Sequence, residues 1–206
     1  MKARTGGGHQ EALRLRLGVS SCLLGDEVRH DGGHRRHRFL AEDLTPYVDW
    51  VRVCPEVELG LGVPREPIQL LRRPGNSFEL WTRDTRRDLT ADMHRWAEQR
   101  LDELPELDGF VLKHRSPSCG IAGARVFETH EALFTDGPHE RTGRGLWAAA
   151  LIARFPDLPV LEESALDDPG TRVLFVRRVL ARHHRRVASP IDVDHEAELL
   201  RRAKRT

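Results

Sequence analysis

Short apolar stretches alternate with segments of helical periodicity, and this alternation restricts the possible folds more than any other feature of the chain. Strand-like apolar stretches occupy residues 15–20, 49–53, 109–113 and 158–161. Helical periodicity occupies residues 89–104, 145–155 and 169–184. Strands that alternate with helices predict an α/β domain, a single Rossmann-like unit with a mostly parallel sheet.

Smaller elements complete this expected organisation. Ile68–Leu71 and Phe78–Thr82 predict a hairpin around residues 74–76. Further expectations are a short helix within residues 39–47, a Gly/Pro-rich loop over 59–67, and a charged helix after a turn at Ser189-Pro190. Asp88 or Thr90 is expected to cap the helix over 89–104, and Asp168 the helix over 169–184. We expect a disordered N-terminus at residues 1–14, the α/β domain over 15–165 and a helical C-terminal extension over 166–206.

The chain has three cysteines, and each follows a predicted strand at or near a Gly or Pro: Cys22, Cys54 and Cys119. In open α/β sheets, sites form beyond the carboxyl ends of the strands, so we expect the three thiols to share one crevice. Three thiolates can hold three irons of a four-iron cluster and leave the fourth iron open. Spacing alone also allows a zinc site completed by His34 or His114, or inert buried thiols.

Composition narrows the class of protein. The net charge is +1, with 39% hydrophobic and 32% charged residues, so no global field attracts nucleic acid. No apolar run approaches the roughly 20 residues of a membrane span, and the N-terminus has no secretory h-region. An odd, small number of cysteines argues against a secreted disulfide scaffold. We therefore expect a cytoplasmic protein without a membrane partner.

Several motifs together resemble one known family. They are VSSCLLG at 19–25, VRHDGGHR at 28–35, CPEV at 54–57, PREP at 64–67, KHRSPSCG at 113–120 and RGLWAA at 144–149. Over roughly residues 15–163 the chain resembles the bacterial thiouracil desulfurase family. The resemblance implies a [4Fe–4S] cluster bound by Cys22, Cys54 and Cys119, and an activity that removes sulfur from thiolated uracil to give uracil and sulfide.

The resemblance also implies roles for single residues. The acid/base carboxylate of the family matches Glu56, and its active-site serine matches Ser116, with Ser118 as the second choice. The chemistry is reasonable, because an open iron is a Lewis acid for a soft thiocarbonyl sulfur and Glu56 can take a proton from the attacking water. Ser116 can instead cap a turn with Pro117. One departure is His30, where the family often has tyrosine.

The Gly-rich segment after the first cysteine is a candidate substrate contact. It consists of Asp31, Gly32, Gly33 and His34, and its glycines let the backbone approach a ligand closely. His34 or Arg29 can meet an oxygen or a phosphate of the substrate, and Ser118 is a further candidate substrate contact. A plain tight turn is the alternative explanation. Lys113 is either a cation beside the cluster or a solvent-facing residue.

The leading hypothesis is an iron–sulfur desulfurase that acts on a thiolated uracil or a related thiolated base. The alternative is a metal-binding sensor, with zinc or a cluster, whose arginine-rich tail contacts RNA without turnover. Free base, nucleoside and thiolated tRNA are all open as substrates, and the sequence does not specify an oligomeric state.

Overall fold

The computed structural model describes residues 14–187 and 193–205. Of the N-terminal residues 1–14 that we expect to be disordered, all but Arg14 lie outside the described residues. The expected turn at Ser189-Pro190 also lies outside them. None of the helices in the two described ranges is both long and apolar enough to span a bilayer.

A parallel four-stranded sheet, sheet A, forms the centre of the fold, with the order β2-β1-β5-β8. Its strands are β1 (Leu15–Ser20), β2 (Val48–Val53), β5 (Gly109–Leu112) and β8 (Val160–Glu162). All four residues of β5 are buried, as expected for a parallel strand covered on both faces. The structure confirms the α/β prediction with a parallel sheet.

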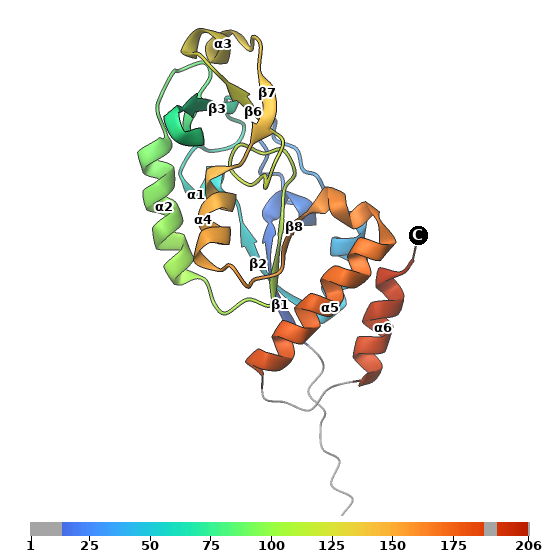
Figure 1. Ribbon diagram of the computed structural model, residues 1–206. Helices are drawn as coiled ribbons and strands as arrows, with labels where there is room; N and C mark the ends of the chain where they lie inside the picture. Colours follow the sequence, from blue (N-terminus) through green and yellow to red (C-terminus); the bar gives the residue numbers. More distant parts are fainter. Residues whose placement is uncertain (1–13, 188–192, 206) are drawn as a thin grey trace, which may run out of the picture.

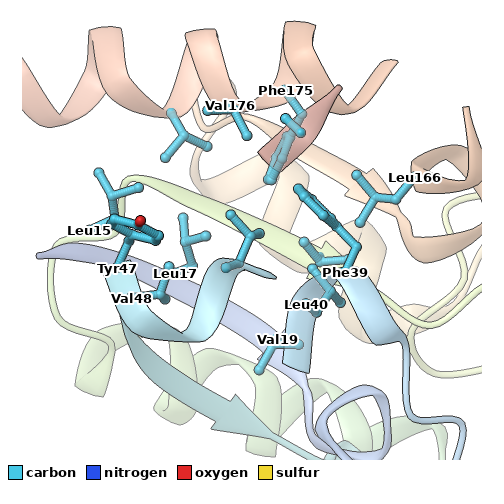
Figure 2. Close-up of a cluster of buried hydrophobic side chains, with 14 of the residues drawn as sticks. Leu15, Leu17, Val19, Phe39, Leu40, Tyr47, Val48, Leu166, Phe175 and Val176 are labelled. Carbon is cyan, nitrogen blue, oxygen red and sulfur yellow. The ribbon is translucent and has the colours of Figure 1, made fainter. Parts of the chain in front are cut away.

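Helices cover both faces of sheet A (Figure 1). On one face lie α5 (Pro169–Arg186), α6 (Val193–Ala203) and the π-helical segment η2 (Phe39–Leu44), which continues into the 3₁₀ turn η3 (Thr45–Tyr47). On the other face lie α2 (Thr90–Glu103) and α4 (Leu146–Arg154). Figure 2 shows the first of these interfaces, where Leu15, Leu17 and Val19 of β1 belong to the same buried cluster as Phe175 and Val176 of α5. The C-terminal helices thus share the core of sheet A.

A second sheet, sheet B, has the order β4-β3-β6-β7. Its strands are β3 (Ile68–Arg73), β4 (Ser77–Thr82), β6 (Ala124–Phe127) and β7 (Glu140–Gly143), with α3 (His130–Thr135) between the last two. The hairpin of β3 and β4 around the turn η4 (Pro74–Asn76) is the one predicted from the sequence. The strands β6 and β7 were not predicted, because they are short and β7 is almost entirely polar and exposed.

Short helices follow the carboxyl ends of three strands of sheet A. The 3₁₀ turn η1 (Ser21–Leu24) follows β1, the single-turn helix α1 (Pro55–Glu58) follows β2, and the 3₁₀ turn η5 (Glu163–Asp167) follows β8. The helix α5 begins at its predicted cap, where the Asp168 carboxylate accepts a hydrogen bond from the Thr171 N–H at 2.7 Å. In α2 the cap position is Leu89, and Asp88 accepts from the Thr90 N–H instead.

Candidate active site

The three cysteines line one cavity of about 250 Å³. Cys22 lies in η1 after β1, Cys54 is the cap residue of α1 after β2, and Cys119 lies in the loop after β5. These strands are neighbours in the order β2-β1-β5 and run parallel, so their carboxyl ends meet at one edge of the sheet. The fold therefore brings together three thiols that are far apart in the sequence.

The environment of the thiols favours their neutral form when no metal is bound. Cys22 and Cys119 are buried, Cys54 is half-buried, and none is in a disulfide. Burial raises the pKa of Cys22 to about 12, although the nearby charge of Lys113 opposes this. Burial also raises the pKa of Cys119 well above its ordinary value, and that of Cys54 to a smaller extent. A cationic centre is what would hold three thiolates here, because metal ligation requires deprotonated thiols.

The three thiols can serve as the donor set of a cluster. Within residues 14–187 and 193–205, no three cysteine, histidine, aspartate or glutamate side chains are grouped closely enough to hold one metal ion. Of the two histidines considered above as zinc ligands, His34 is exposed and does not line the cavity, whereas His114 lines it and has its Nε2 3.8 Å from Glu162. In an iron–sulfur cluster each cysteine binds a different iron, so the sulfur atoms stand around a larger object. Three thiols spread around one cavity match that requirement.

Glu56 lies on the wall of the same cavity, two residues after Cys54 in α1. Its Oε1 accepts a hydrogen bond from the Ser118 hydroxyl at 3.0 Å. Its Oε2 accepts two from Arg65, from Nε at 2.8 Å and from Nη2 at 2.6 Å. The side chains of Glu56 and Arg65 are only 15% and 5% exposed, so this ion pair is shielded from solvent and well oriented.

The two candidate serines have different partners. Ser116 lines the cavity, and its Oγ accepts hydrogen bonds from the N–H groups of Ser118 at 3.2 Å and Cys119 at 3.1 Å. Ser118, the other candidate substrate contact, is fully buried, is not among the residues that line the cavity, and donates to Glu56. Ser116 therefore holds the turn that carries Cys119 and also faces the cavity, so the two roles weighed for it from the sequence are compatible.

The Gly-rich segment over residues 31–34 is not among the residues that line the cavity. Asp31 accepts a hydrogen bond from the Gly33 N–H at 3.1 Å, and His34 accepts one from the Arg36 N–H at 3.1 Å, which are contacts typical of a tight turn. Arg29, also considered above as a substrate contact, lines the cavity together with Val28 and His30. A substrate contact by residues 31–34 stays a prediction.

Sequence reasoning gave no role to Arg65 or Arg115, although both line the cavity. Arg65 lies in the PREP motif, and the signal that could have singled it out is an arginine placed shortly after Glu56 in a Gly/Pro-rich loop. Arg115 has a left-handed backbone (φ 58°), which is uncommon for a residue other than glycine and is typical of a constrained site. Lys113 also lines the cavity; it pairs with Glu163 and donates to the His114 carbonyl at 3.0 Å.

Comparison with known proteins identifies the family. The model of the 2-thiouracil desulfurase family matches residues 17–163. The chain belongs to the 2-thiouracil desulfurase family. The matched region runs from β1 to the start of η5, so it includes all three cysteines, Glu56 and both serines, and the family resemblance seen in the motifs is confirmed.

Two known proteins are similar to this chain. A solved structure, the [4Fe-4S]-dependent thiouracil desulfidase TudS, is similar with a TM-score of 0.55 and 31% identity, over 74% of this chain and 93% of TudS. The uncharacterized protein YbbK of Bacillus subtilis (strain 168) is 32% identical over 111 residues, which are 50% of this chain and 71% of YbbK. Family membership and the likeness to TudS support a desulfurase enzyme.

Proposed function

We propose that this protein uses a [4Fe–4S] cluster, held by Cys22, Cys54 and Cys119, to replace the sulfur of a thiolated uracil or related thiolated base by oxygen. The observation that carries the proposal is the shared cavity, which is lined by the three thiols and by the Glu56 carboxylate. Support for the cluster comes from the donor set described above and from TudS, a [4Fe-4S]-dependent enzyme of similar fold.

The reaction needs an electrophile, a base and a hydrogen-bond donor. When bound, a cluster with three cysteine ligands supplies an open iron, a soft Lewis acid that suits a thiocarbonyl sulfur. Water adds to the carbon that bears sulfur, the carbon–sulfur bond breaks, and the products are the oxo base and hydrosulfide. No electron is gained or lost overall.

Glu56 is the base, and its hydrogen bonds determine which oxygen acts. A carboxylate oxygen has about two lone-pair sites. Both sites of Oε2 are taken by Nε and Nη2 of Arg65, whereas Oε1 has one partner, the Ser118 hydroxyl. Oε1 therefore keeps the capacity to accept the proton of the attacking water.

Ser116 is the donor. Two backbone N–H groups occupy its lone pairs, so the unused capacity of this hydroxyl is its hydrogen. Because Ser116 lines the cavity, that hydrogen can be donated to the ring or to the thiocarbonyl group of the substrate. Donation to a ring heteroatom would stabilise negative charge that develops when water adds.

The test is anaerobic reconstitution followed by quantification of sulfide and uracil released from 2-thiouracil, with thiouridine and thiolated tRNA as further substrates. We expect equal amounts of both products, and Glu56→Gln should lower kcat by about 100-fold or more while the cluster absorbance is retained. Glu79→Gln is the matched control, because Glu79 also pairs with an arginine, Arg73 at 2.7 Å, but lies in β4 outside the cavity.

Two results would contradict the proposal. One is an intact cluster with no sulfide release from any of these substrates. The other is undiminished turnover by Glu56→Gln. Salt-sensitive RNA binding without turnover would instead favour a sensor.

A further inference from the structure

Arg65 connects three segments around the cavity. Its guanidinium donates to Glu56 Oε2, to the Gly62 carbonyl at 2.8 Å and to the Val28 carbonyl at 2.9 Å. Its backbone N–H donates to the His30 carbonyl at 2.9 Å. The side chain is 5% exposed, so these hydrogen bonds are made in a largely water-free environment where they constrain geometry strongly.

The loop before Arg65 turns the chain back toward α1. Gly60 and Gly62 have positive φ angles of 89° and 74°, a conformation that glycine adopts without steric cost. This course places the guanidinium beside the carboxylate of α1, although no regular element lies between α1 and β3. The buried arginine of this loop donates hydrogen bonds to four oxygen atoms, and these contacts restrict Glu56 to one orientation.

We propose that Arg65 is a positioning residue of the desulfuration reaction and acts through Glu56. By occupying Oε2 completely, it leaves Oε1 as the oxygen that accepts the proton. Arg65 also donates to the Val28 carbonyl, and the Sγ of Cys54 lies 3.8 Å from that carbonyl oxygen. Through this hydrogen bond, Arg65 fixes Glu56 relative to Val28 and Cys54. This inference rests on the proposed function, because it assigns Arg65 to that reaction.

Geometry, and not charge alone, is what Arg65 supplies. A guanidinium presents five N–H donors in a rigid plane, whereas a lysine ammonium is a point charge on a flexible chain. Lysine at position 65 would keep the positive charge beside Glu56. It would be unable to reproduce the paired contact with Oε2 while also reaching the carbonyls of Val28 and Gly62.

The experiment compares Arg65→Lys with the wild-type holoenzyme after anaerobic reconstitution. We expect kcat to fall by about 10- to 100-fold, because a misplacement of about 1 Å can cost a factor of 100. KM should change by less than about threefold, because substrate binding is not the interaction lost. Iron content and cluster absorbance should equal those of the wild type.

A double variant separates positioning from general stability. If Arg65 acts through Glu56, then Arg65→Lys should cause no further loss of kcat in a Glu56→Gln background. Arg73→Lys is the matched control. Arg73 also pairs with a glutamate, Glu79 at 2.7 Å, but neither residue lines the cavity, so kcat should stay at the wild-type value.

The outcomes distinguish the two proposals. Wild-type kcat in Arg65→Lys, loss of iron from that variant, or an additive loss in the double variant would each overturn the positioning role and leave the proposed function standing. Absence of turnover in the wild-type holoenzyme would overturn both.

Discussion

Ser116 and Ser118 are two positions apart, yet their hydroxyl groups serve different parts of the site. Ser118 donates one hydrogen bond to Glu56, whereas Ser116 accepts two from the backbone of the turn that carries Cys119. A change at Ser118 therefore affects the proposed base, Glu56. A change at Ser116 affects both a proposed donor to the substrate and the turn that carries Cys119, a proposed cluster ligand. Sequence reasoning found both residues but had no means to separate these roles.

Alanine at each serine should reveal the difference. Ser118→Ala removes one hydrogen bond from Glu56, and we expect kcat to fall by about tenfold with the cluster retained, which corresponds to about 1.4 kcal/mol. Ser116→Ala leaves the N–H groups of Ser118 and Cys119 without their acceptor, so the cluster absorbance should also decay faster in air. The measurements are kcat and the rate of bleaching in both variants. Equal bleaching rates would contradict the assignment.

At the scale of elements, the start of α4 holds the loop that carries Cys119. The first N–H groups of a helix have no partner within the helix. Here the Gly145 N–H donates to the Gly120 carbonyl at 2.8 Å, and the Leu146 N–H donates to the Pro117 carbonyl at 3.2 Å. The RGLWAA motif, conspicuous in the sequence but without an obvious function, therefore lies where α4 docks against the loop of the third cysteine.

Gly145 permits this docking because it has no side chain. A Cβ at this position would lie 2.3 Å from the carbonyl carbon and oxygen of Ser118 and 2.8 Å from the Cys119 nitrogen. We therefore expect Gly145→Ala to displace the loop and to lower the iron bound per chain severalfold after reconstitution. Gly170→Ala is the control, since glycine at the start of α5 meets only the Asp168 side chain, at 3.2 Å. Wild-type iron content in Gly145→Ala would refute this account.

At the scale of the whole molecule, the sequence predicts sheet A and its helices well, because buried parallel strands such as β5 are continuous apolar runs. Sheet B was half predicted: β3 and β4 form a hairpin around a clear turn, whereas β7 has a polar, exposed sequence and is specified mainly by backbone pairing with β6. The convergence of the cysteines follows from strand order. The role of Arg65 does not, because the path of an irregular loop brings it to Glu56.

At the amino ends of its strands, opposite the cavity, sheet A has a buried ionic network that joins β1, β5 and α5. Asp108, just before β5, has a fully buried side chain. Its carboxylate accepts hydrogen bonds from Arg186 at 2.8 and 2.9 Å, from the Arg16 N–H at 2.8 Å, and lies 3.1 Å from His183 Nδ1. Burial opposes ionisation of this carboxyl, but the hydrogen bonds from Arg186, Arg16 and His183 outweigh it and lower the pKa of Asp108 below its ordinary value of 3.8.

This network should stabilise the fold without taking part in the reaction. Asp108→Asn removes the charge that compensates Arg186, and we expect a loss of about 3 kcal/mol in the free energy of unfolding at pH 7, measured with urea. Asp102→Asn is the control: Asp102 is 71% exposed and pairs with Arg154, so less than about 1 kcal/mol should be lost. Turnover per folded, iron-loaded chain should be unchanged in both variants, because neither residue lines the cavity.

The pH dependence of stability gives an independent test of the same network. Because folding lowers the pKa of Asp108, its stabilising contribution is complete above the unfolded-state value of 3.8 and is lost as the pH falls through the lower folded-state value. The wild type should therefore lose stability more steeply than Asp108→Asn as the pH falls below 3.8, and the two urea midpoints should approach each other. Parallel curves for the two proteins would show that Asp108 is not the group whose ionisation links α5 to the sheet.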